Sequence, residues 1–352
     1  MLQYLLMKLL ILTSVYSCRA SSQHRIPLYP VYSETNQHFG YALKMIIGIP
    51  EEEYTLLLST LSPIMQIFGP NCLHPFCVGK KSYGLTGKKL LKTYQLSRNE
   101  ILAEGWKDTV SFEKSNGSLS FKDFEFAVAV AVHSTNVEDR INVDGIFGLF
   151  RSFEENPIFT AMMQNNILPS IGIAAPPMEW NKEAVLTLGG FDQTLCDTNN
   201  STVLMRHSRI LAFPYFAIFF GKTAYAPSFV LRTVFVIANS PYITVASAFM
   251  ESIARNYDLQ YNSQLNKYLT KSNNIPHSLD IYLHGNGDSR MDILSINSKY
   301  FIKKYNVTHN ELLIRPHFGP QSTIIQLGLP FLHSYCVLQS HNDSLFFAPY
   351  KN

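Results

Sequence analysis

Charge is scarce in this sequence. Charged residues make up 16% of its 352 positions, and 29 Lys and Arg against 26 Asp and Glu leave a formal net charge of +3. So small a surplus provides no electrostatic footprint for nucleic acid or for an anionic membrane surface. The apolar stretches at 124–132 and 210–220 are much shorter than the roughly 20 residues of a membrane-spanning helix. We therefore expect neither nucleic-acid binding nor a membrane span.

The N-terminal segment 1–20 has the pattern of a secretory signal peptide. Met7-Lys8 precedes the apolar run 9–16, and Cys18 and Ala20 supply the small residues that precede a cleavage site. The chain ends without a retention or lipidation motif. The sequence therefore predicts a soluble, secreted protein.

Cysteine is also scarce, with five in the chain. Removal of Cys18 with the signal peptide leaves four, and an even number in an exported chain indicates two disulfides with three possible connectivities. The four are Cys72, Cys77, Cys196 and Cys336. The short spacing of the first two favours a local loop between them, which pairs the other two. A zinc site is the competing interpretation, but no histidine is suitably spaced around the second pair, so we expect no metal and no cofactor.

Asn-X-Ser/Thr sequons fit the same route of export. They predict exposed loops, with glycans where the export pathway supports them. The sequons begin at Asn116, Asn199, Asn200, Asn306 and Asn342.

Strand patterns dominate the rest of the chain. Short β-branched or aromatic segments, separated by Gly, Pro, Asn and Ser, recur from about residue 42 to residue 350, and we read 324–332 as one of them. Helical periodicity is clear only at 247–257, with Ser247 as a plausible N-cap, and a second short helix is possible at 157–166. An apolar fraction of 46% is ample for a core. The sequence predicts an all-β protein with a few short helices and a length suited to about two domains.

A weak internal repeat suggests how the domains are related. LLLSTLSP (56–63) resembles FVIANSPY (235–242), and each is followed much later by an apolar pair and a glycine, Gly148 and Gly328. The interval from Ser59 to Ala238 is only one position shorter than the interval from Gly148 to Gly328. Such similar offsets predict two duplicated lobes related by a pseudo-twofold axis.

At these residues the chain resembles the pepsin-like aspartic proteases over nearly all of its mature length. Residues 54–62 fall where the family has an aromatic-Thr-apolar-apolar-apolar-Asp-Thr-Gly-Ser segment. Residues 143–150 resemble Phe-Asp-Gly-Ile-Leu-Gly-Leu, and 327–340 and 345–350 resemble the family's closing segments.

The resemblance implies a bilobal fold with a shared central sheet, a cleft between the lobes and a hairpin flap above it. The lobes are expected at 21–194 and 195–352. The resemblance places Cys196 and Cys336 near the shared sheet, which makes their pairing reasonable, although it departs from the family's usual second-lobe disulfide.

The chemistry of the family depends on two carboxylates, one from each lobe. Because two like charges so close together cannot both ionise cheaply, they share one proton. The ionised member takes a proton from water, while the protonated member polarises the peptide carbonyl. By this resemblance Ser59 stands at the first aspartate position and Ala238 at the second, so we expect no catalytic residue.

The surroundings of the lost pair have changed as well. The glycines that follow the aspartates become Leu61 and Ser240. Thr60 and Asn239 keep hydrogen-bonding side chains where the family's threonines interlock the two loops. Tyr94 is the best match to the flap tyrosine, and residues 95–98 replace the glycines of the flap tip.

The favoured hypothesis is a secreted, non-catalytic monomer that binds a peptide, protein or glycan through the cleft or its rim. One alternative is a residual aspartic-type endopeptidase that hydrolyses peptide bonds with substitute carboxylates; Asp144 is the nearest candidate, although its position suggests a turn-stabilising side chain. Another is a structural secreted glycoprotein. An open, apolar cleft lined by Ser59, Ala238 and Tyr94 favours binding, whereas a cleft filled by its own side chains favours the structural role.

Overall fold

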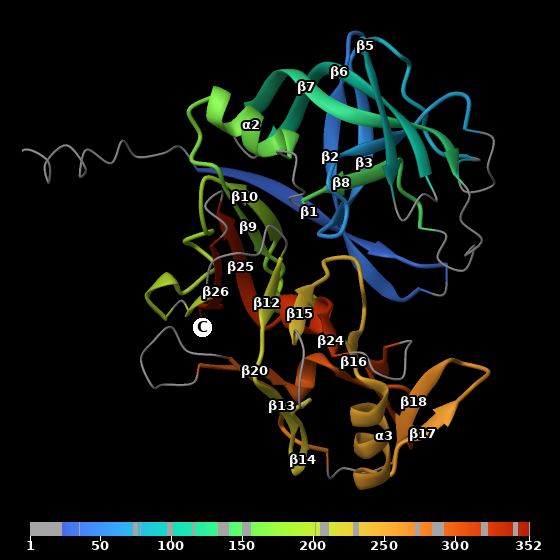
Figure 1. The fold of residues 1–352 in the computed structure, drawn as a ribbon, viewed down its shortest axis with the longest axis vertical. Helices are drawn as coiled ribbons and strands as arrows, with labels where there is room; N and C mark the ends of the chain where they lie inside the picture. Colours follow the sequence, from blue (N-terminus) through green and yellow to red (C-terminus); the bar gives the residue numbers. More distant parts are fainter. Residues whose placement is uncertain are drawn as a thin grey trace, which may run out of the picture.

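Strands build two lobes on either side of a shared sheet, so the chain has the expected all-β, bilobal pepsin-like fold (Figure 1). The computed structural model describes residues 23–34, 36–72, 77, 79–96, 101–114, 117–132, 141–149, 156–200, 202–204, 211–227, 232–271, 275–283, 292–317, 323–340 and 344–351. The expected signal peptide, 1–20, lies outside these residues. Within them, no helix is long and apolar enough to cross a membrane.

In its described residues, the N-terminal lobe is a curved sheet with one helix against it. Its elements are β2 (His38–Ile47), β3 (Glu52–Ser59), β4 (Gln66–Phe68), β5 (Lys88–Leu96), β6 (Ile101–Lys114), β7 (Gly117–Val132), β8 (Gly145–Gly148) and α2 (Pro157–Gln164). The expected helix at 157–166 is confirmed as α2, which Asn156 caps by accepting a hydrogen bond from the backbone N–H of Ile158. Strands β5 and β6 form a long antiparallel hairpin at the place in the chain where the flap is expected.

The central sheet joins residues from both ends of the chain. Its strands are β1 (His24–Tyr32), β9 (Ser170–Ala174), β10 (Ala184–Leu188), β11 (Thr202–Leu204), β25 (Tyr335–Ser340) and β26 (Leu345–Pro349). Strand β1 pairs with β10 through its first half and with β2 through its second half, and so connects this sheet to the N-terminal lobe. The expected lobe boundary at 194/195 falls between β10 and β11 and stays a prediction.

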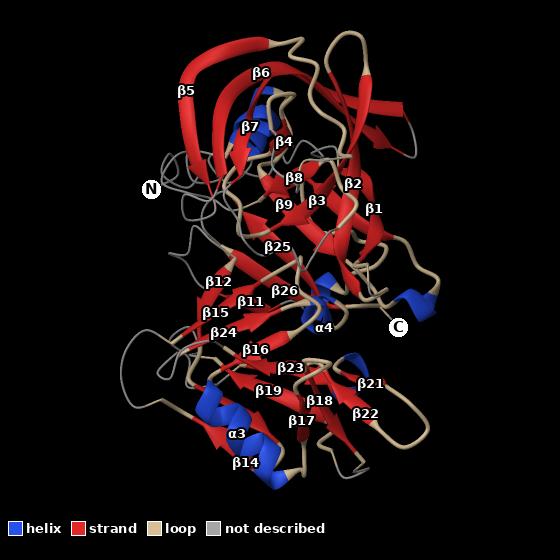
Figure 2. Cartoon of the chain, turned by 90° about the vertical axis from the view of Figure 1, so that its right-hand side faces the viewer, coloured by secondary structure: helices blue, strands red, loops and turns tan. Residues whose placement is uncertain are grey.

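In its described residues, the C-terminal lobe contains three smaller sheets. The first holds β12 (Ala212–Pro214), β15 (Thr233–Val236), β24 (Ile324–Leu327), β16 (Ile243–Val245) and β23 (Ile314–Pro316); the second holds β14 (Thr223–Tyr225), β13 (Ala217–Phe220), β19 (Ser278–Tyr282) and β20 (Ile293–Asn297); the third holds β17 (Gln260–Asn262), β18 (Lys267–Thr270), β22 (Asn310–Leu312) and β21 (Ile302–Lys304). Helix α3 (Ser247–Asn256) packs against β14 and β23 at the far end of this lobe (Figure 2). Short helical segments connect consecutive strands: η1 (Met178–Trp180), η2 (Thr198–Asn200), η3 (Ser298–Tyr300) and α4 (Leu329–Leu332).

Two local expectations are wrong. Ser247 is the first residue of α3 and not its N-cap, because its hydroxyl donates to the carbonyl of His317 instead of bonding the helix end. The segment 324–332 is not one strand: β24 ends at Leu327, and α4 begins after Gly328 with Pro330 in its first turn. A Cβ on Gly328 would lie 2.2 Å from the carbonyl oxygen of Ser240, so only glycine allows the close approach of the two segments there.

Candidate functional site

The same arrangement of strands occurs at the inner end of each lobe. In the N-terminal lobe β3 runs parallel to β8, with Leu58 beside Phe147, and β4 pairs with β8 at Gln66 and Ile146. In the C-terminal lobe β15 runs parallel to β24, with Val236 beside Leu327, and β16 pairs with β24 at Thr244 and Gln326. The two lobes are therefore duplicated at the level of strand register.

The register corrects the expected pairing of Ser59 with Ala238. Because Leu58 and Val236 occupy equivalent places in the two sheets, Ser59, which follows Leu58, is equivalent to Ile237, which follows Val236. The expected position of the second lost aspartate is wrong by one residue. The interval from Gly148 to Gly328 is longer than the interval from Ser59 to Ile237, so the spacing of the glycines does not align the two loops correctly.

A hydrogen bond supports this register. The hydroxyl of Thr60 donates to the carbonyl oxygen of Val236 at 2.7 Å and accepts from the backbone N–H of Ala238 at 3.2 Å. Thr60 thus interlocks the two loops as expected, and its equivalent is Ala238, which has no hydroxyl to return the contact. The expected partner, Asn239, is equivalent to Leu61 instead, and its buried Oδ1 has no hydrogen-bond partner among the described residues.

Ser59 lies at the end of β3 with its hydroxyl held by the backbone. Its Oγ accepts from the N–H groups of Leu61 and Ser62, each at 3.3 Å. The side chain of Ser62 is also occupied, since it donates to the carbonyl of Ile64 and accepts from Gln66. Ser59 therefore acts as a turn-forming residue, and its hydroxyl donates to no acceptor among the described residues.

A cavity of about 670 Å³ opens between the lobes at these loops. The N-terminal lobe contributes Ser59, Leu61, Ser62, Pro63 and Ile146, and the C-terminal lobe contributes Phe235, Asn239, His317, Ile324 and Gln326. We call this space the interlobe cavity. Of the residues that the structure describes, no Asp, Glu, Lys or Arg lines it. Ile237 is buried and Ala238 fully buried, and neither lines the cavity.

Tyr94 does not reach the interlobe cavity. It lies on β5 opposite Ala103, and its hydroxyl donates to Glu125, while the ammonium of Lys92 lies 4.8 Å from the centre of its ring. Burial, followed by the hydrogen bond with Glu125, raises the pKa of Tyr94. The residue lines a separate cavity of about 420 Å³ between the hairpin and α2. The structure therefore does not bring Ser59, Ala238 and Tyr94 together, and the tip residues 97 and 98 lie outside the described residues.

Asp144 has a structural role. Its carboxylate accepts from the backbone N–H of Thr55 at 2.9 Å and from that of Lys81 at 3.0 Å. It ties the turn before β8 to β3 and does not line the interlobe cavity, in agreement with its expected turn-stabilising role.

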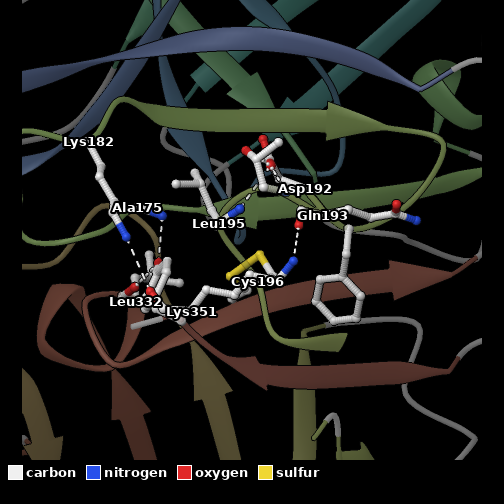
Figure 3. The surroundings of a disulfide bond; sticks show 12 residues. Ala175, Lys182, Asp192, Gln193, Leu195, Cys196, Leu332 and Lys351 are labelled. Carbon is white, nitrogen blue, oxygen red and sulfur yellow. Dashed lines mark hydrogen bonds between the residues drawn. A yellow bond between two sulfur atoms is a disulfide. The ribbon is translucent and has the colours of Figure 1, made fainter. Parts of the chain in front are cut away.

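Two disulfides have the expected pairings, Cys72 with Cys77 and Cys196 with Cys336. The second joins β25 to the segment after β10, within the central sheet (Figure 3). Around it, Asp192 accepts from the N–H of Leu195, and Lys351 donates to the carbonyl of Gln193. No group of three His, Cys, Asp or Glu side chains in the described ranges could hold a metal ion.

The predicted glycosylation positions are exposed where they can be assessed. Asn199 and Asn200 lie in η2, and Asn306 lies in the turn after β21, where its Oδ1 accepts from the N–H of Thr308. Asn116 and Asn342 lie outside the described residues. Their modification stays a prediction.

Phe235, His317 and Gln326 line the interlobe cavity and were not singled out from the sequence. The missed signal for the register was a dipeptide that both loops share, Ser62-Pro63 and Ser240-Pro241. Aligning these two dipeptides places Ile237, and not Ala238, opposite Ser59.

Comparison with known proteins agrees with the fold. No family model matches the chain. Over 336 residues it is 24% identical to Aspartic protease 6 of Caenorhabditis elegans, an alignment that covers 88% of this chain and 82% of that protein. This distant similarity, over almost the whole bilobal fold, supports a relationship to the pepsin-like aspartic proteases.

Proposed function

We propose that this chain is a secreted, non-catalytic relative of the pepsin-like proteases that binds a ligand in the interlobe cavity. One observation carries the proposal: the described lining of this cavity contains no carboxylate. The equivalent loop positions hold Ser59 and Ile237, so neither lobe supplies half of an acid–base pair.

The remaining groups do not substitute for that pair. A serine hydroxyl is too weakly acidic to act as a general base, and as a nucleophile it needs a base within hydrogen-bonding reach. The Oγ of Ser59 accepts from two backbone N–H groups, and among the described residues it has no bond to an imidazole. His317 also lines the cavity, but Ser59 has no hydrogen bond to it among the described residues, so peptide hydrolysis at this site has neither the carboxylate pair nor an activated nucleophile.

The lining favours an uncharged peptide as the ligand. Leu61, Ile146, Phe235 and Ile324 offer apolar contact, and Ser59 offers a hydroxyl hydrogen to a main-chain carbonyl. Apolar walls with a few neutral polar groups are typical of sites that bury a ligand. Leu61 lines the cavity with 48% of its surface exposed, so a bound ligand can cover its apolar surface.

The test uses the purified secreted chain and a diverse peptide library from acidic to neutral pH. Mass spectrometry scores peptides that are retained and peptides that are cut. We expect retention without cleavage. Cleavage that stops with a transition-state inhibitor of aspartic proteases contradicts the proposal and favours the endopeptidase alternative. Neither retention nor cleavage also contradicts it, and favours a glycan or protein partner or a structural role.

A matched pair of variants locates the binding. Leu61→Glu places a charge in the neutral wall of the interlobe cavity, so it should reduce retention about tenfold or more. Leu85→Glu adds the same charge at a similarly exposed leucine that does not line the cavity and should leave retention unchanged. Equal losses would mean that peptides adhere elsewhere.

A further inference from the structure

A second cavity, of about 230 Å³, lies where the start of β2 meets the C-terminal lobe. We call it the junction cavity. Its lining comes from β2, η1, η3, β21 and α4, so it is distinct from the interlobe cavity. The charged and titratable residues of its lining are His38, Glu179, Lys299, Tyr300, Lys303 and His333.

Two histidines from distant parts of the sequence stack in its wall. The rings of His38 and His333 lie 5.9 Å apart at 20° to each other. The Nε2 of His38 is 3.0 Å from the carbonyl oxygen of Gly40, whereas the Nε2 of His333 is buried without a hydrogen-bond partner among the described residues. Burial lowers the pKa of His38 to about 4 and that of His333 to about 3. Both rings are therefore neutral near pH 7.

Tyrosine rings lie against both histidines. Tyr41 meets the ring of His38 edge-on at 4.9 Å, and Tyr32 lies 5.5 Å from it. On the other side the ring of Tyr300 lies 6.3 Å from that of His333. None of these neighbours is a carboxylate, so a proton on either histidine has no carboxylate among these rings to offset it.

The other side of the junction cavity carries two lysines. Lys299 lies over the rings of Tyr300, at 4.8 Å, and Trp180, at 5.6 Å. Neither Lys299 nor Lys303 forms an ion pair with a carboxylate in the part of the chain that the structure describes. Glu179 is the one acidic residue of the described lining. The lining therefore has a small positive excess, which increases by one charge for each histidine that takes up a proton.

We propose that the junction cavity binds a tetrahedral oxyanion, a phosphate or sulfate group, between Lys299 and Lys303, and binds it more tightly as the pH falls. A tetrahedral oxyanion is small enough for the cavity, and its several oxygens can accept hydrogen bonds from more than one ammonium group. The lysines attract it at any physiological pH, and a bound anion favours protonation of the two histidines, whose charge then adds attraction. Because binding and protonation are linked, the anion also raises the proton affinity of the histidines by the same factor.

The experiment measures binding of inorganic sulfate to the full secreted chain by calorimetry at about pH 4.5 and about pH 7.5, with chloride holding the ionic strength constant. We expect roughly tenfold tighter binding at the lower pH, within the usual range of coupling between sites. Buffers of different ionisation enthalpy should reveal proton uptake on binding at the lower pH. Absence of sulfate binding at both values, or binding that is independent of pH, overturns the proposal.

Neighbouring lysines provide the control. Lys303→Gln should weaken sulfate binding about fivefold or more, whereas Lys304→Gln, whose side chain is also exposed but does not line the junction cavity, should not. Equal weakening would indicate only diffuse attraction to a positive surface. His38→Gln should keep binding near pH 7.5 and lose most of the pH dependence, because His38 has the higher pKa of the two histidines. A sulfated disaccharide compared with free sulfate then distinguishes a glycan ester from the free ion as the source of the group.

Discussion

Thr60 connects the two lobes through one hydroxyl group. That hydroxyl donates to Val236 and accepts from Ala238, and the side chain is almost fully buried. Thr60→Val keeps the shape but leaves both backbone groups unpaired, so we expect a loss of roughly 1–3 kcal/mol in the free energy of unfolding. Urea denaturation measures it. Thr55→Val on the same strand, β3, is the control; a similar loss there would mean that β-strand packing and not the interlobe bond is responsible.

The register of Ser59 with Ile237 can be tested by restoring carboxylates. We expect Ser59→Asp with Ile237→Asp to place two carboxylates at equivalent positions, which titrate as a coupled pair with one raised pKa. Ser59→Asp with Ala238→Asp instead puts the second charge at the fully buried position equivalent to Thr60, where it does not share a proton with the carboxylate at position 59, so it should be less stable. Unfolding followed against pH distinguishes the two. Greater stability of the Ala238 variant would contradict the register.

Peptide cleavage by the Ser59 and Ile237 double variant should remain inefficient. The hydroxyl of Tyr94 is bound to Glu125 and the residue does not line the interlobe cavity, so a flap contact to the restored pair is missing. The same peptide library provides the assay. Efficient cleavage would mean that the site has lost only its two carboxylates.

The two disulfides close loops of very different length. The sequence separation is 5 for Cys72 and Cys77, whereas it is 140 for Cys196 and Cys336. In the chain-entropy description, the long loop restricts the unfolded state far more, so replacing Cys196 and Cys336 by alanine should cost roughly 5 kcal/mol against roughly 2 kcal/mol for Cys72 and Cys77. Denaturation of both double variants measures the difference. Equal losses would show that local packing outweighs loop closure.

Most elements were predictable from the sequence because strand patterns depend on local side-chain chemistry. The all-β class, α2, α3 and both disulfide pairs follow from spacing and apolar alternation. The register between Ser59 and Ile237 was missed because these two side chains differ in chemistry and the Ser-Pro dipeptide that both loops share was not used to align them; strand pairing fixes their relation. The neighbours of Tyr94 and the stacking of His38 on His333 are long-range contacts, for which a single sequence carries no signal.

At the scale of the whole molecule, His38 and His333 make the junction of β2 with α4 sensitive to acid. Both have a pKa lowered by burial, to about 4 and about 3, while in the unfolded chain it lies near 6.5. The unfolded state therefore binds more protons below pH 6.5, and stability falls as the pH drops from there through about 4. We expect these two residues to remove roughly 3–6 kcal/mol by pH 4, measured by denaturation in buffers that contain neither phosphate nor sulfate.

Paired histidine variants separate this effect from the titration of carboxylates. His333→Gln cannot take up the proton and should flatten the fall in unfolding free energy between about pH 6.5 and pH 4. His277→Gln, at an exposed histidine away from the junction cavity, should leave the fall unchanged. Equal curves for all three proteins would assign acid sensitivity to the carboxylates. A fall that only His333→Gln flattens means that the contact between the two lobes weakens with acid, the reverse of what an acid-working protease requires.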